Sequence, residues 1–519
     1  MGLGAWLETP RIYIVLLALT LVLRSPTLLD SMYLVDEGYS GAIASEMLYG
    51  GSIYETAVDM RAPLIYYSYY WVFLLTGQNN LFAIHLVAIL IVFVVAALTR
   101  TIGRRLAGVH AGGWAGIGFV LFSHSYLPRD TLAANIEIFT LLPLTLSLFL
   151  FLSGTKNRHL GTLTLSGALV SVAMFYRQPS ALYLAAFGAY FLYAWLIAKS
   201  INWRTAVSQG LFTLFGFVVC TAAIITWHQS QGNWDSLVFW VWTTSKRYIQ
   251  VDTTLAYVLR RLLLVHGTFI LAGTLFWFFG VGELIRKIRS AVTQRSEEGA
   301  TWVIVIGWFA VSYATIYLGW RFSGHYHLLA LPPLALFAGK ALTAVVDRHR
   351  SSAVKHRRRV YLGIAGAALA PAVGFLIMAF VIREETVAFK PITQYITAQT
   401  IQTDRIFVWG SAPQVYSFSN RRMASRMTTC AYLVGMFASR PRNGVIDESK
   451  WIVPGSWDML AQDFKAHPPE LIVDMSPVSS DWGPHPMSRY PFMAAYLTGY
   501  HKETTVIGAD IYRRILPDS

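Results

Sequence analysis

Two adjacent carboxylates, Asp36 and Glu37, follow the first hydrophobic segment of the chain, and the segment Asp59–Met60–Arg61 comes soon after them. Adjacent carboxylates repel one another and lose hydration beside apolar sequence, so a cation, a metal or a substrate proton has to compensate. A carboxylate held in this way can act as a general base toward an attacking hydroxyl. A solvated loop with two charges is an equally good interpretation of the dipeptide alone, so the rest of the chain has to decide.

The composition is that of a polytopic membrane protein. Of the 519 residues, 55% are hydrophobic and 13% are charged, whereas soluble domains carry about 25% charged residues. Almost all of the net charge of +14 lies in the hydrophobic part, with 28 Lys and Arg against 15 Asp and Glu up to residue 382 and 14 against 13 beyond it. This excess is the usual positive-inside bias, and no basic, aromatic-rich platform for nucleic acid is evident.

Eleven hydrophobic segments are long enough, at about 20 residues each, to cross a membrane as helices. The first lacks a small-residue cleavage site, which favours a retained helix over a signal peptide. The segments near 137 and 328 are short or broken by proline. The predicted transmembrane helices are 8–28, 80–102, 107–126, 137–153, 160–176, 180–198, 206–227, 262–282, 301–319, 328–346 and 360–382.

The connections between these helices differ in charge. Clusters at 104–105, 156–158, 199–204, 286–289 and 348–359 are basic and fall on one side, which the positive-inside rule assigns to the cytoplasm. An odd number of helices then places the N-terminus in the cytoplasm and the C-terminal tail outside. The opposite side carries carboxylates and single cations, namely Asp36, Glu37, Glu46, Glu55, Asp59, Asp130, Glu137, Asp235 and Asp252 with Arg61, Arg129, Arg177, Lys246, Arg247 and Arg321.

Two outer loops, 29–79 and 228–261, are long and rich in aromatic residues, as in Tyr66–Tyr67–Ser68–Tyr69–Tyr70–Trp71. Such stretches suit helices that lie in the membrane interface with their rings at the depth of the headgroups. For any single ring, a place in an aromatic belt explains its presence without a further function.

The tail differs from the rest of the chain and predicts a small extracytoplasmic α/β domain. Residues 403–410 are typical of a turn, a short buried strand and a breaker, 469–474 of a second strand, and 504–512 of a hairpin with Gly508 near its turn. Helical patterns at 390–401, 454–466 and 490–500 lie between them. The sequence therefore predicts two domains, a transmembrane domain at 1–382 and an α/β domain at 383–519.

Three stretches of this sequence resemble the polyprenyl-phosphate-sugar-dependent membrane glycosyltransferases of the GT-C fold, which include the protein O-mannosyltransferases and the aminoarabinose transferases of lipid A. The first is Asp36–Glu37 with the later Arg61–Ala62–Pro63–Leu64, similar to a Lys/Arg–Pro–Pro–Leu segment. The second is Ala134 to Phe139, which includes Glu137. The third runs from Trp320 to Tyr326 and on to Leu331–Pro332–Pro333–Leu334. Two departures, Ala62 for the first proline and Arg61 for lysine, leave the donor open.

The resemblance implies an inverting transfer of a hexosyl or pentosyl unit from a polyprenyl-phosphate donor to an extracytoplasmic glycan, lipid or protein. Asp36 is expected to be the base, with Glu137 as the second acidic position and Glu37 as an orienting partner in the catalytic set. Cations are expected to stabilise the departing phosphate, since arginine binds phosphate oxygens bidentately. The candidate phosphate-binding residues are Arg61, Arg321, His325 and Tyr326, followed by Arg129, Arg177, Lys246 and Arg247.

Other interpretations stay open at this point. A divalent cation on Asp36 and Glu37 is compatible with the residue types, and no other cofactor is indicated. Zinc at His325 and His327 is disfavoured because no cysteine or third histidine is near in the sequence. A transporter or flippase of lipid-linked sugars is the alternative function, although transporters place their charges near the midplane and often contain repeats. A ligand-sensing receptor would not need carboxylates at the membrane edge. The expected location is the cytoplasmic membrane.

Overall fold

The computed structural model describes residues 9–29, 32–249, 254–349, 354–381, 384–436 and 449–515. Contacts divide the chain into two compact units: unit 1 comprises 1–29, 85–226 and 255–382, and unit 2 comprises 30–84, 227–254 and 383–519. Unit 2 thus combines the two long predicted loops with the tail. The division into domains 1–382 and 383–519 stays a prediction, because units defined by contacts do not follow the order of the sequence.

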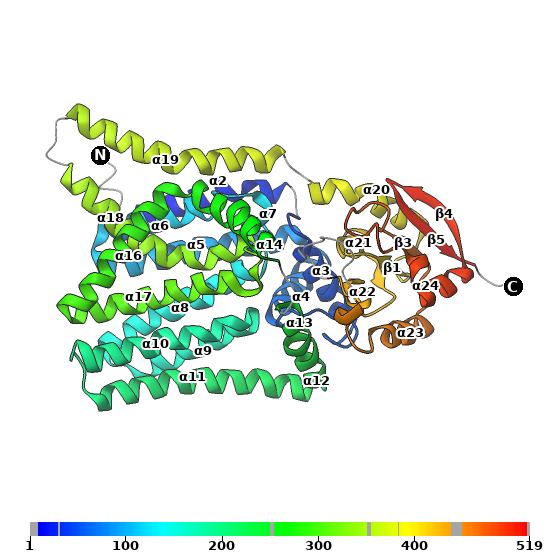
Figure 1. Ribbon diagram of the computed structural model, residues 1–519, viewed down its shortest axis with the longest axis horizontal. Coiled ribbons are helices and arrows are strands. Elements are labelled where there is room, and N and C mark those ends of the chain that lie inside the picture. The colour runs from blue at the N-terminus through cyan, green and yellow to red at the C-terminus, as the bar shows by residue number, and fades with distance from the viewer. Residues whose placement is uncertain are drawn as a thin grey trace. The chain divides into compact units, whose positions relative to one another are not determined.

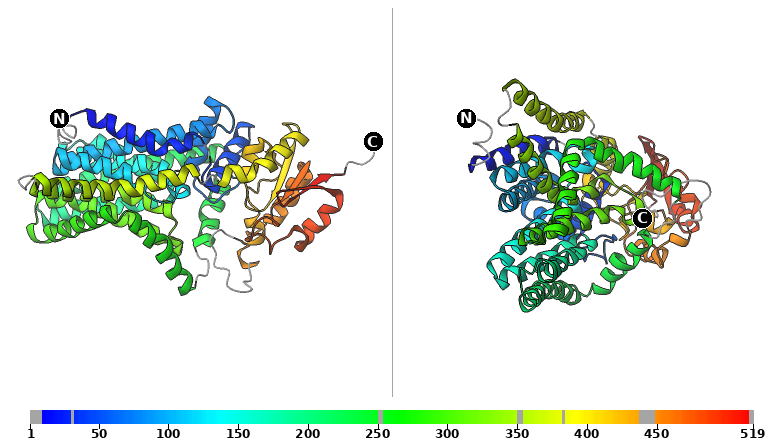
Figure 2. Two further views of the ribbon diagram at one scale, coloured as in Figure 1. Left: turned by 90° about the horizontal axis from the view of Figure 1, so that it is seen from above. Right: turned by 60° about the vertical axis from the view of Figure 1, so that its left-hand side comes forward.

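Unit 1 consists of long apolar helices that run side by side (Figure 1; two further views in Figure 2). Among the described residues, nine helical stretches are long and apolar enough to cross a membrane, and two shorter apolar helices, α6 (Val109–Phe122) and α9 (Leu160–Tyr176), accompany them. The nine are Arg11–Leu28 (α2 and η1), Leu81–Ala107 (α5), Ile136–Asn157 (α8), Gln178–Ile197 (η2, α10 and η3), Trp203–Ser230 (α11), Leu255–Ala272 (α14, η5 and α15), Glu297–Trp320 (α17 and η6), Gly324–Arg348 (η7 and α18) and Val354–Val381 (α19).

These stretches follow the predicted segments with one difference. The helix predicted at 262–282 is wrong in its bounds, because the chain forms one stretch at Leu255–Ala272 and a separate helix, α16, at Thr274–Gln294. The break falls at Gly273, whose φ of −108° and ψ of 26° are not helical. Glycine is the residue that most readily leaves the helical conformation, which accounts for the position of the break. Residue 8, Asp252 and residues 350–353 of the basic loop lie outside the described residues.

Close helix packing in unit 1 depends on small residues. Helix α8 packs on α9, α6 on α18, and α10 on α17. Where α9 and α11 cross, a Cβ atom at Gly167 would lie 1.8 Å from the carbonyl oxygen of Thr213, and one at Gly216 would lie 1.8 Å from that of Thr164. Only glycine permits this backbone approach, which is the usual way in which membrane helices come together.

Unit 2 begins with two helices from the first long loop, α3 (Val35–Leu48) and α4 (Leu64–Thr76). The second long loop contributes α12 (Trp234–Leu237), the π-helical segment η4 (Val238–Thr244) and α13 (Ser245–Ile249). Helix α3 packs on α4 and on α21 (Gln414–Ser419) of the tail. A Cβ atom at Gly38 would lie 2.8 Å from the backbone nitrogen of Gln414. The glycine after the carboxylate pair therefore allows α3 to pack against the tail.

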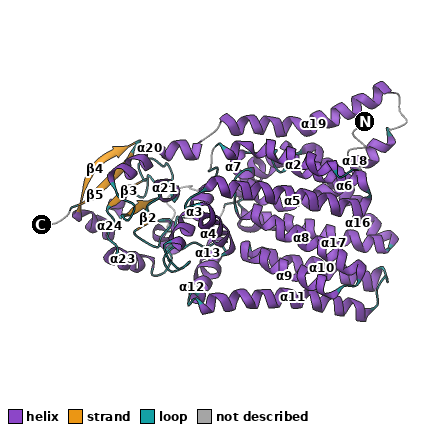
Figure 3. Cartoon of the chain, turned by 180° about the vertical axis from the view of Figure 1, so that it is seen from behind, coloured by secondary structure: helices purple, strands orange, loops and turns teal. Residues whose placement is uncertain are grey.

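The tail contains a five-stranded sheet in the order β2-β1-β3-β5-β4 (Figure 3). Strands β2 (Arg422–Met423), β1 (Arg405–Trp409) and β3 (Leu471–Asp474) are parallel, with Phe407 opposite Ile472. Strands β4 (Tyr500–Val506) and β5 (Ala509–Arg514) form an antiparallel hairpin that joins the sheet through β3. Ile507 and Gly508 both have positive φ, as a two-residue hairpin turn requires. The predicted strands and the turn at Gly508 are confirmed.

Helices α20 (Glu384–Gln399), α23 (Ser456–Ala466) and α24 (Pro491–Tyr496) flank this sheet and correspond to the three predicted helical patterns. The ring of Phe464 on α23 meets Phe407 of β1 edge to face, with 4.8 Å between the centroids. The short elements β2, α21 and α22 (Ala431–Val434) were not expected from the sequence. Two to six residues are too few to show a hydrophobic period.

Candidate active site

Asp36 and Glu37 lie in the first turn of α3 in unit 2. Glu37 is fully buried, and its Oε2 accepts hydrogen bonds from the backbone nitrogens of Tyr33 at 2.7 Å and Leu34 at 3.1 Å. These are orphan donors at the start of the helix, so Glu37 supplies half of a capping box; Leu34 has no side-chain acceptor for the other half. The two carboxylates of the pair therefore have different surroundings, although they are adjacent in the sequence.

Asp36 is paired with Arg61, which lies between two carboxylates. The Nη2 atom of Arg61 is 2.6 Å from Oδ1 of Asp36, and its Nη1 atom donates to Oδ2 of Asp59. The side chains of Asp36 and Arg61 are 21% and 19% exposed, whereas that of Asp59 is 1% exposed. The cluster of these three residues carries a formal charge of −1 and presents one carboxylate, Asp36, toward solvent.

Asp59 is satisfied on both oxygens. Its Oδ2 also accepts the hydroxyl of Tyr66 at 2.8 Å, and its Oδ1 accepts the hydroxyl of Tyr432 at 2.9 Å and the backbone nitrogen of Met60 at 2.6 Å. Burial and the charge of Asp59 raise the pKa of both tyrosines well above the ordinary value, so their hydroxyls stay protonated and donate. Burial lowers the pKa of Arg61, but the charges of Asp36 and Asp59 raise it further, which keeps the guanidinium positive.

The other two cations expected in this unit lie in the second long loop. Lys246 is exposed on α13. The Nη1 atom of Arg247 is 3.4 Å from the backbone oxygens of Lys450 and Ile452 in the tail. Arg247 thus connects α13 to the segment that follows α22.

In unit 1, Glu137 lies in the first turn of α8, which Asn135 caps through a bond from Ile138 N to its Oδ1. Its Oε1 is 3.5 Å from Nε of Arg177, and the two side chains are only 6% and 11% exposed. Arg177 also donates to the side chain and the backbone oxygen of Thr315 and lies 5.4 Å from the ring centroid of Tyr326. Arg177 therefore ties α8 to the end of α17 and to the segment that carries Tyr326.

A second acidic residue of unit 1, Asp130, pairs with His325. Oδ1 of Asp130 is 3.0 Å from Nδ1 and 3.2 Å from the backbone nitrogen of His325. Burial raises the pKa of Asp130, but the hydrogen bonds and charge of His325, with Arg129 at 3.8 Å, bring it below the ordinary value. A Cβ atom at Gly324 would lie 2.7 Å from Cγ of Asp130, so glycine allows this approach.

Arg321 lies in a strained stretch between η6 (Thr315–Trp320) and η7 (Gly324–Ala330). Its neighbours Trp320 and Phe322 have φ of 55° and 51°, values that bulky residues rarely adopt. Arg321 is 2% exposed, and its backbone oxygen accepts a bond of 2.8 Å from Nε of Arg261. Backbone strain of this kind is retained only where surrounding contacts enforce it, and it often marks a functional segment.

The two histidines of the His–x–His pattern have different partners. His325 pairs with Asp130, whereas Nε2 of His327 is 2.7 Å from Nδ1 of His266, and Nδ1 of His327 faces the backbone oxygen of Gly324 at 3.1 Å. In the part of the chain that the structure describes, no group of three or more His, Cys, Asp or Glu residues is placed to hold a metal ion. For a cation at the acidic pair, one oxygen of Asp36 and one of Glu37 are already engaged with Arg61 and with backbone amides.

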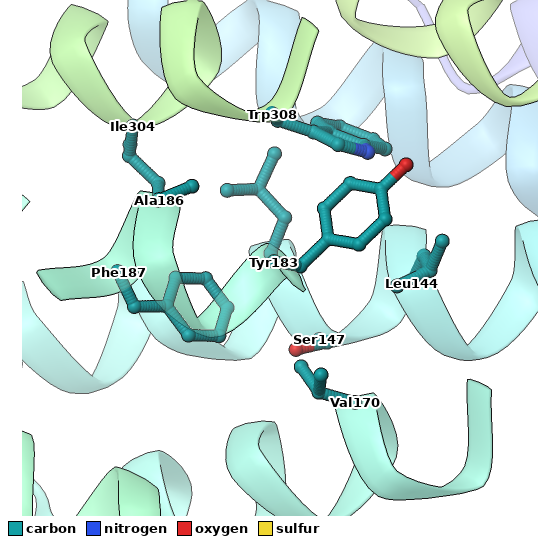
Figure 4. A pocket seen from close by; sticks show the side chains of 9 residues that line it. Leu144, Ser147, Val170, Tyr183, Ala186, Phe187, Ile304 and Trp308 are labelled. Atoms are coloured by element: carbon teal, nitrogen blue, oxygen red, sulfur yellow. The ribbon is translucent and has the colours of Figure 1, made fainter. Parts of the chain in front are cut away.

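A small internal cavity of unit 1 lies apart from these residues. It encloses about 10 Å³, about the space of one water molecule. Helices α8, α9, α10 and α17 supply its mainly apolar walls, and Tyr183 and Ser312 form a 2.6 Å hydrogen bond beside it (Figure 4). The cavity is too small for a sugar.

Sequence reasoning did not select Asp59, Tyr66, Tyr432 or Asp130 as site residues. Asp59 and Asp130 belong to the acidic outer set, but residue type alone did not distinguish them from Glu46 or Glu55. Tyr432 is 373 residues from Asp59, and its neighbours in the sequence carry no motif. Only the folded chain relates it to the acidic pair.

No protein-family model and no curated protein sequence matches the chain. Solved structures do. ArnT from Cupriavidus metallidurans, solved with undecaprenyl phosphate, is 14% identical with a TM-score of 0.61, and the match covers 99% of each chain. The oligosaccharyltransferase AglB from Archaeoglobus fulgidus, solved with an inhibitory peptide and a dolichol-phosphate, is 11% identical with a TM-score of 0.59 over 98% of this chain and 74% of that one. The protein is thus a polytopic membrane protein of the GT-C fold with a small C-terminal α/β domain.

Proposed function

We propose that the protein is an inverting glycosyltransferase that moves a sugar from a polyprenyl-phosphate donor to an acceptor outside the cytoplasm. The observation that carries the proposal is the partly exposed carboxylate of Asp36, paired through one oxygen with Arg61, within a fold shared with ArnT and AglB. The two solved relatives hold undecaprenyl phosphate and a dolichol-phosphate, respectively, which supports a lipid phosphate as the donor's carrier here.

In this proposal Asp36 is the general base. Its Oδ1 is held by Arg61, and Oδ2 accepts the proton of the acceptor hydroxyl. The hydroxyl oxygen then forms a bond to the anomeric carbon, and the bond from that carbon to the phosphate oxygen breaks with both electrons on the phosphate. The products are the glycosylated acceptor and the polyprenyl phosphate. Attack and departure on opposite faces of the sugar invert the anomeric configuration.

Positive groups stabilise the charge that develops on the departing phosphate. Arg177 already contacts Glu137, Thr315 and the ring of Tyr326, so we assign Glu137 and Arg177 the role of holding Tyr326 and the strained Arg321 segment. Glu37 is assigned the cap of α3. The separate candidates for this role are Arg321, His325, Tyr326 and Arg129 in unit 1, and Lys246 and Arg247 in unit 2. Arg61 holds the base instead, because its two terminal nitrogens are engaged with Asp36 and Asp59.

Two features support a reaction at the outer face of the membrane: the charge of the loops and the length of the polyprenyl chain. Basic loops favour a cytoplasmic N-terminus and an extracytoplasmic tail in the cytoplasmic membrane. A long polyprenyl chain has to lie along apolar surface that is open to the bilayer, which exposed apolar side chains of α11 such as Leu211, Phe215 and Val218 provide. The sugar and the acceptor, including the mannose suggested by the resemblance, are left to the assay.

The test uses purified full-length protein in detergent with a panel of radiolabelled polyprenyl-phosphate sugars and a membrane extract as acceptor. Asp36→Asn should lower the transfer rate by about 10²–10⁴-fold, the usual contribution of a general base. The matched control is Asp458→Asn, at an exposed position of α23 in the same unit. Parallel reactions with EDTA and with added Mg²⁺ report any need for a metal. Equal transfer by wild type and Asp36→Asn would remove Asp36 from its role, and no transfer from any donor would count against the enzyme.

A further inference from the structure

Asp59 is the most completely engaged carboxylate of unit 2. It is almost fully buried and accepts hydrogen bonds from Arg61, Tyr66, Tyr432 and the backbone nitrogen of Met60. A carboxylate has about four lone-pair sites, so these four donors use its full capacity. Burying an aspartate costs free energy unless such partners are present, and this completeness indicates a selected arrangement.

The three segments of unit 2 all converge on the turn that holds Asp59. From the first segment, the hydroxyl of Tyr54 donates to the backbone oxygen of Arg61 at 2.7 Å. From the second, Oγ of Ser245 donates to the backbone oxygen of Met60 at 2.8 Å. From the tail, Tyr432 reaches Asp59 itself, and the ring of Trp240 lies 5.1 Å from the Tyr432 ring. Helix α3 packs on α4, and both helices are labelled with α13 in Figure 1.

We propose that Asp59 and Tyr432 are positioning residues that fix the guanidinium of Arg61 and, through it, the carboxylate of Asp36. This inference rests on the proposed role of Asp36 as the base. Arg61 has one fork nitrogen on Asp59 and the other on Asp36. Because the guanidinium is planar and rigid, fixing the first nitrogen also fixes the second. The carboxylate oxygen left on Asp36 is then presented in one orientation.

The face of Arg61 is restrained as well. Its guanidinium lies 5.0 Å from the ring centroid of Tyr39 on α3, the helix that carries Asp36. The hydroxyl of Tyr39 is 3.4 Å from Oγ of Ser411 in the tail, and burial raises the pKa of Tyr39 to about 12. The ring therefore stays neutral beside the cation. Removing the Tyr432 hydroxyl would leave the backbone nitrogen of Met60 as the one remaining donor to Oδ1 of Asp59 among the described residues. The side chain of Asp59 would then hold the guanidinium of Arg61 less firmly.

The arrangement gives the tail a place in the reaction. Tyr432 is at the start of α22, in a stretch where Thr428 also donates to the backbone oxygen of Val58 at 2.7 Å. The base is thus held by a residue of the α/β domain, so the orientation of Asp36 depends on how that domain is folded. A misplaced reacting group lowers the chemical rate and leaves donor binding unchanged.

The experiment compares Tyr432→Phe with Tyr500→Phe in the purified full-length protein. Tyr500 is a matched control because it is also a buried tail tyrosine whose hydroxyl donates to a protein oxygen, the backbone oxygen of Pro469 at 2.7 Å. Tyr432→Phe should lower kcat by about 10- to 100-fold with an unchanged KM for the polyprenyl-phosphate sugar, and Tyr500→Phe should not. Asp59→Asn, which keeps the shape of the side chain, should show the same split between kcat and KM.

Hydrogen–deuterium exchange provides a readout that does not depend on turnover. Exchange at the Met60 amide should accelerate in Tyr432→Phe and in Asp59→Asn, and should be unchanged in Tyr500→Phe. If the exchange result holds while no donor supports transfer in wild type, the hold on Asp59 stands and the proposed function fails. Identical kcat and exchange in Tyr432→Phe and Tyr500→Phe would overturn the inference, and so would a raised KM with an unchanged kcat.

Discussion

The Asp36 cluster of unit 2 and the Glu137–Arg177 pair of unit 1 are built from the same residue types with different results. Both place a carboxylate in the first turn of a helix and pair it with an arginine. The two terminal nitrogens of Arg61 contact two different carboxylates, and one of these, Asp36, is still partly accessible to solvent. Arg177 divides its donors between Glu137 and Thr315, and all of these groups are nearly buried.

The difference shows what an ion pair contributes in each place. The stability of the folded protein depends on a buried ion pair, because removing one partner leaves the other charged and desolvated. In a pair whose carboxylate is partly exposed, the carboxylate oxygen that does not contact the arginine is available for a substrate proton. The same contrast separates Asp36 from its neighbour Glu37, which is buried and used by the backbone.

The largest expected effect in this comparison comes from Arg177→Leu, which leaves Glu137 buried without its cation. We expect a loss of about 3–5 kcal/mol in the free energy of unfolding. The matched control is Arg129→Ala, because Arg129 is 65% exposed and lies 3.8 Å from Asp130; it should change stability by about 1 kcal/mol or less. Thermal unfolding in detergent measures both. Similar melting temperatures for the two variants would show that the stability of the protein does not depend on the Glu137–Arg177 pair.

A smaller effect is expected at Gly324→Ala. Its added methyl group would meet Asp130 and Tyr126 at 2.7 Å, so the Asp130–His325 pair has to move. Overpacking of this kind destabilises by about 1–3 kcal/mol. Gly363→Ala on α19, where no atom lies within 4 Å of the added Cβ, should be neutral or slightly stabilising. Equal losses at both positions would mean that the fit of Gly324 against Asp130 is unimportant.

The sequence predicted the helices of unit 1 because apolar segments of membrane length are distinctive. Proline at 143 did not disrupt α8, since neighbouring helices support a membrane helix around such a residue. The π-helical segments at 193–197 and 262–267 were not predicted, because a π turn differs from an α turn in hydrogen bonding and not in composition. In the tail, β1 and β3 were evident as short runs that are buried on both faces.

The acidic pair was recognisable from the sequence, but the different roles of Asp36 and Glu37 were only suggested there. That Glu37 caps α3 follows from the backbone amides of Tyr33 and Leu34, and their direction is a property of the folded chain. The contacts of Asp59 with Tyr66 and Tyr432 are 7 and 373 residues apart in the sequence, and only the first is local. Long-range contacts of this kind have no signal in one sequence.

The smallest expected effect is at Glu37, and it separates the two carboxylates of the pair. Glu37→Gln keeps an amide oxygen that can accept from Tyr33 and Leu34, so both stability and transfer rate should stay close to wild type. Glu37→Ala removes the acceptor and should cost about 0.5–2 kcal/mol in stability, as the loss of a helix cap does. Thermal unfolding and the transfer assay would be run on both variants beside Asp36→Asn. If Glu37→Gln lost transfer as severely as Asp36→Asn, both carboxylates would take part in the chemistry. Asp36 as a partly exposed base and Glu37 as a buried helix cap would then no longer differ in function.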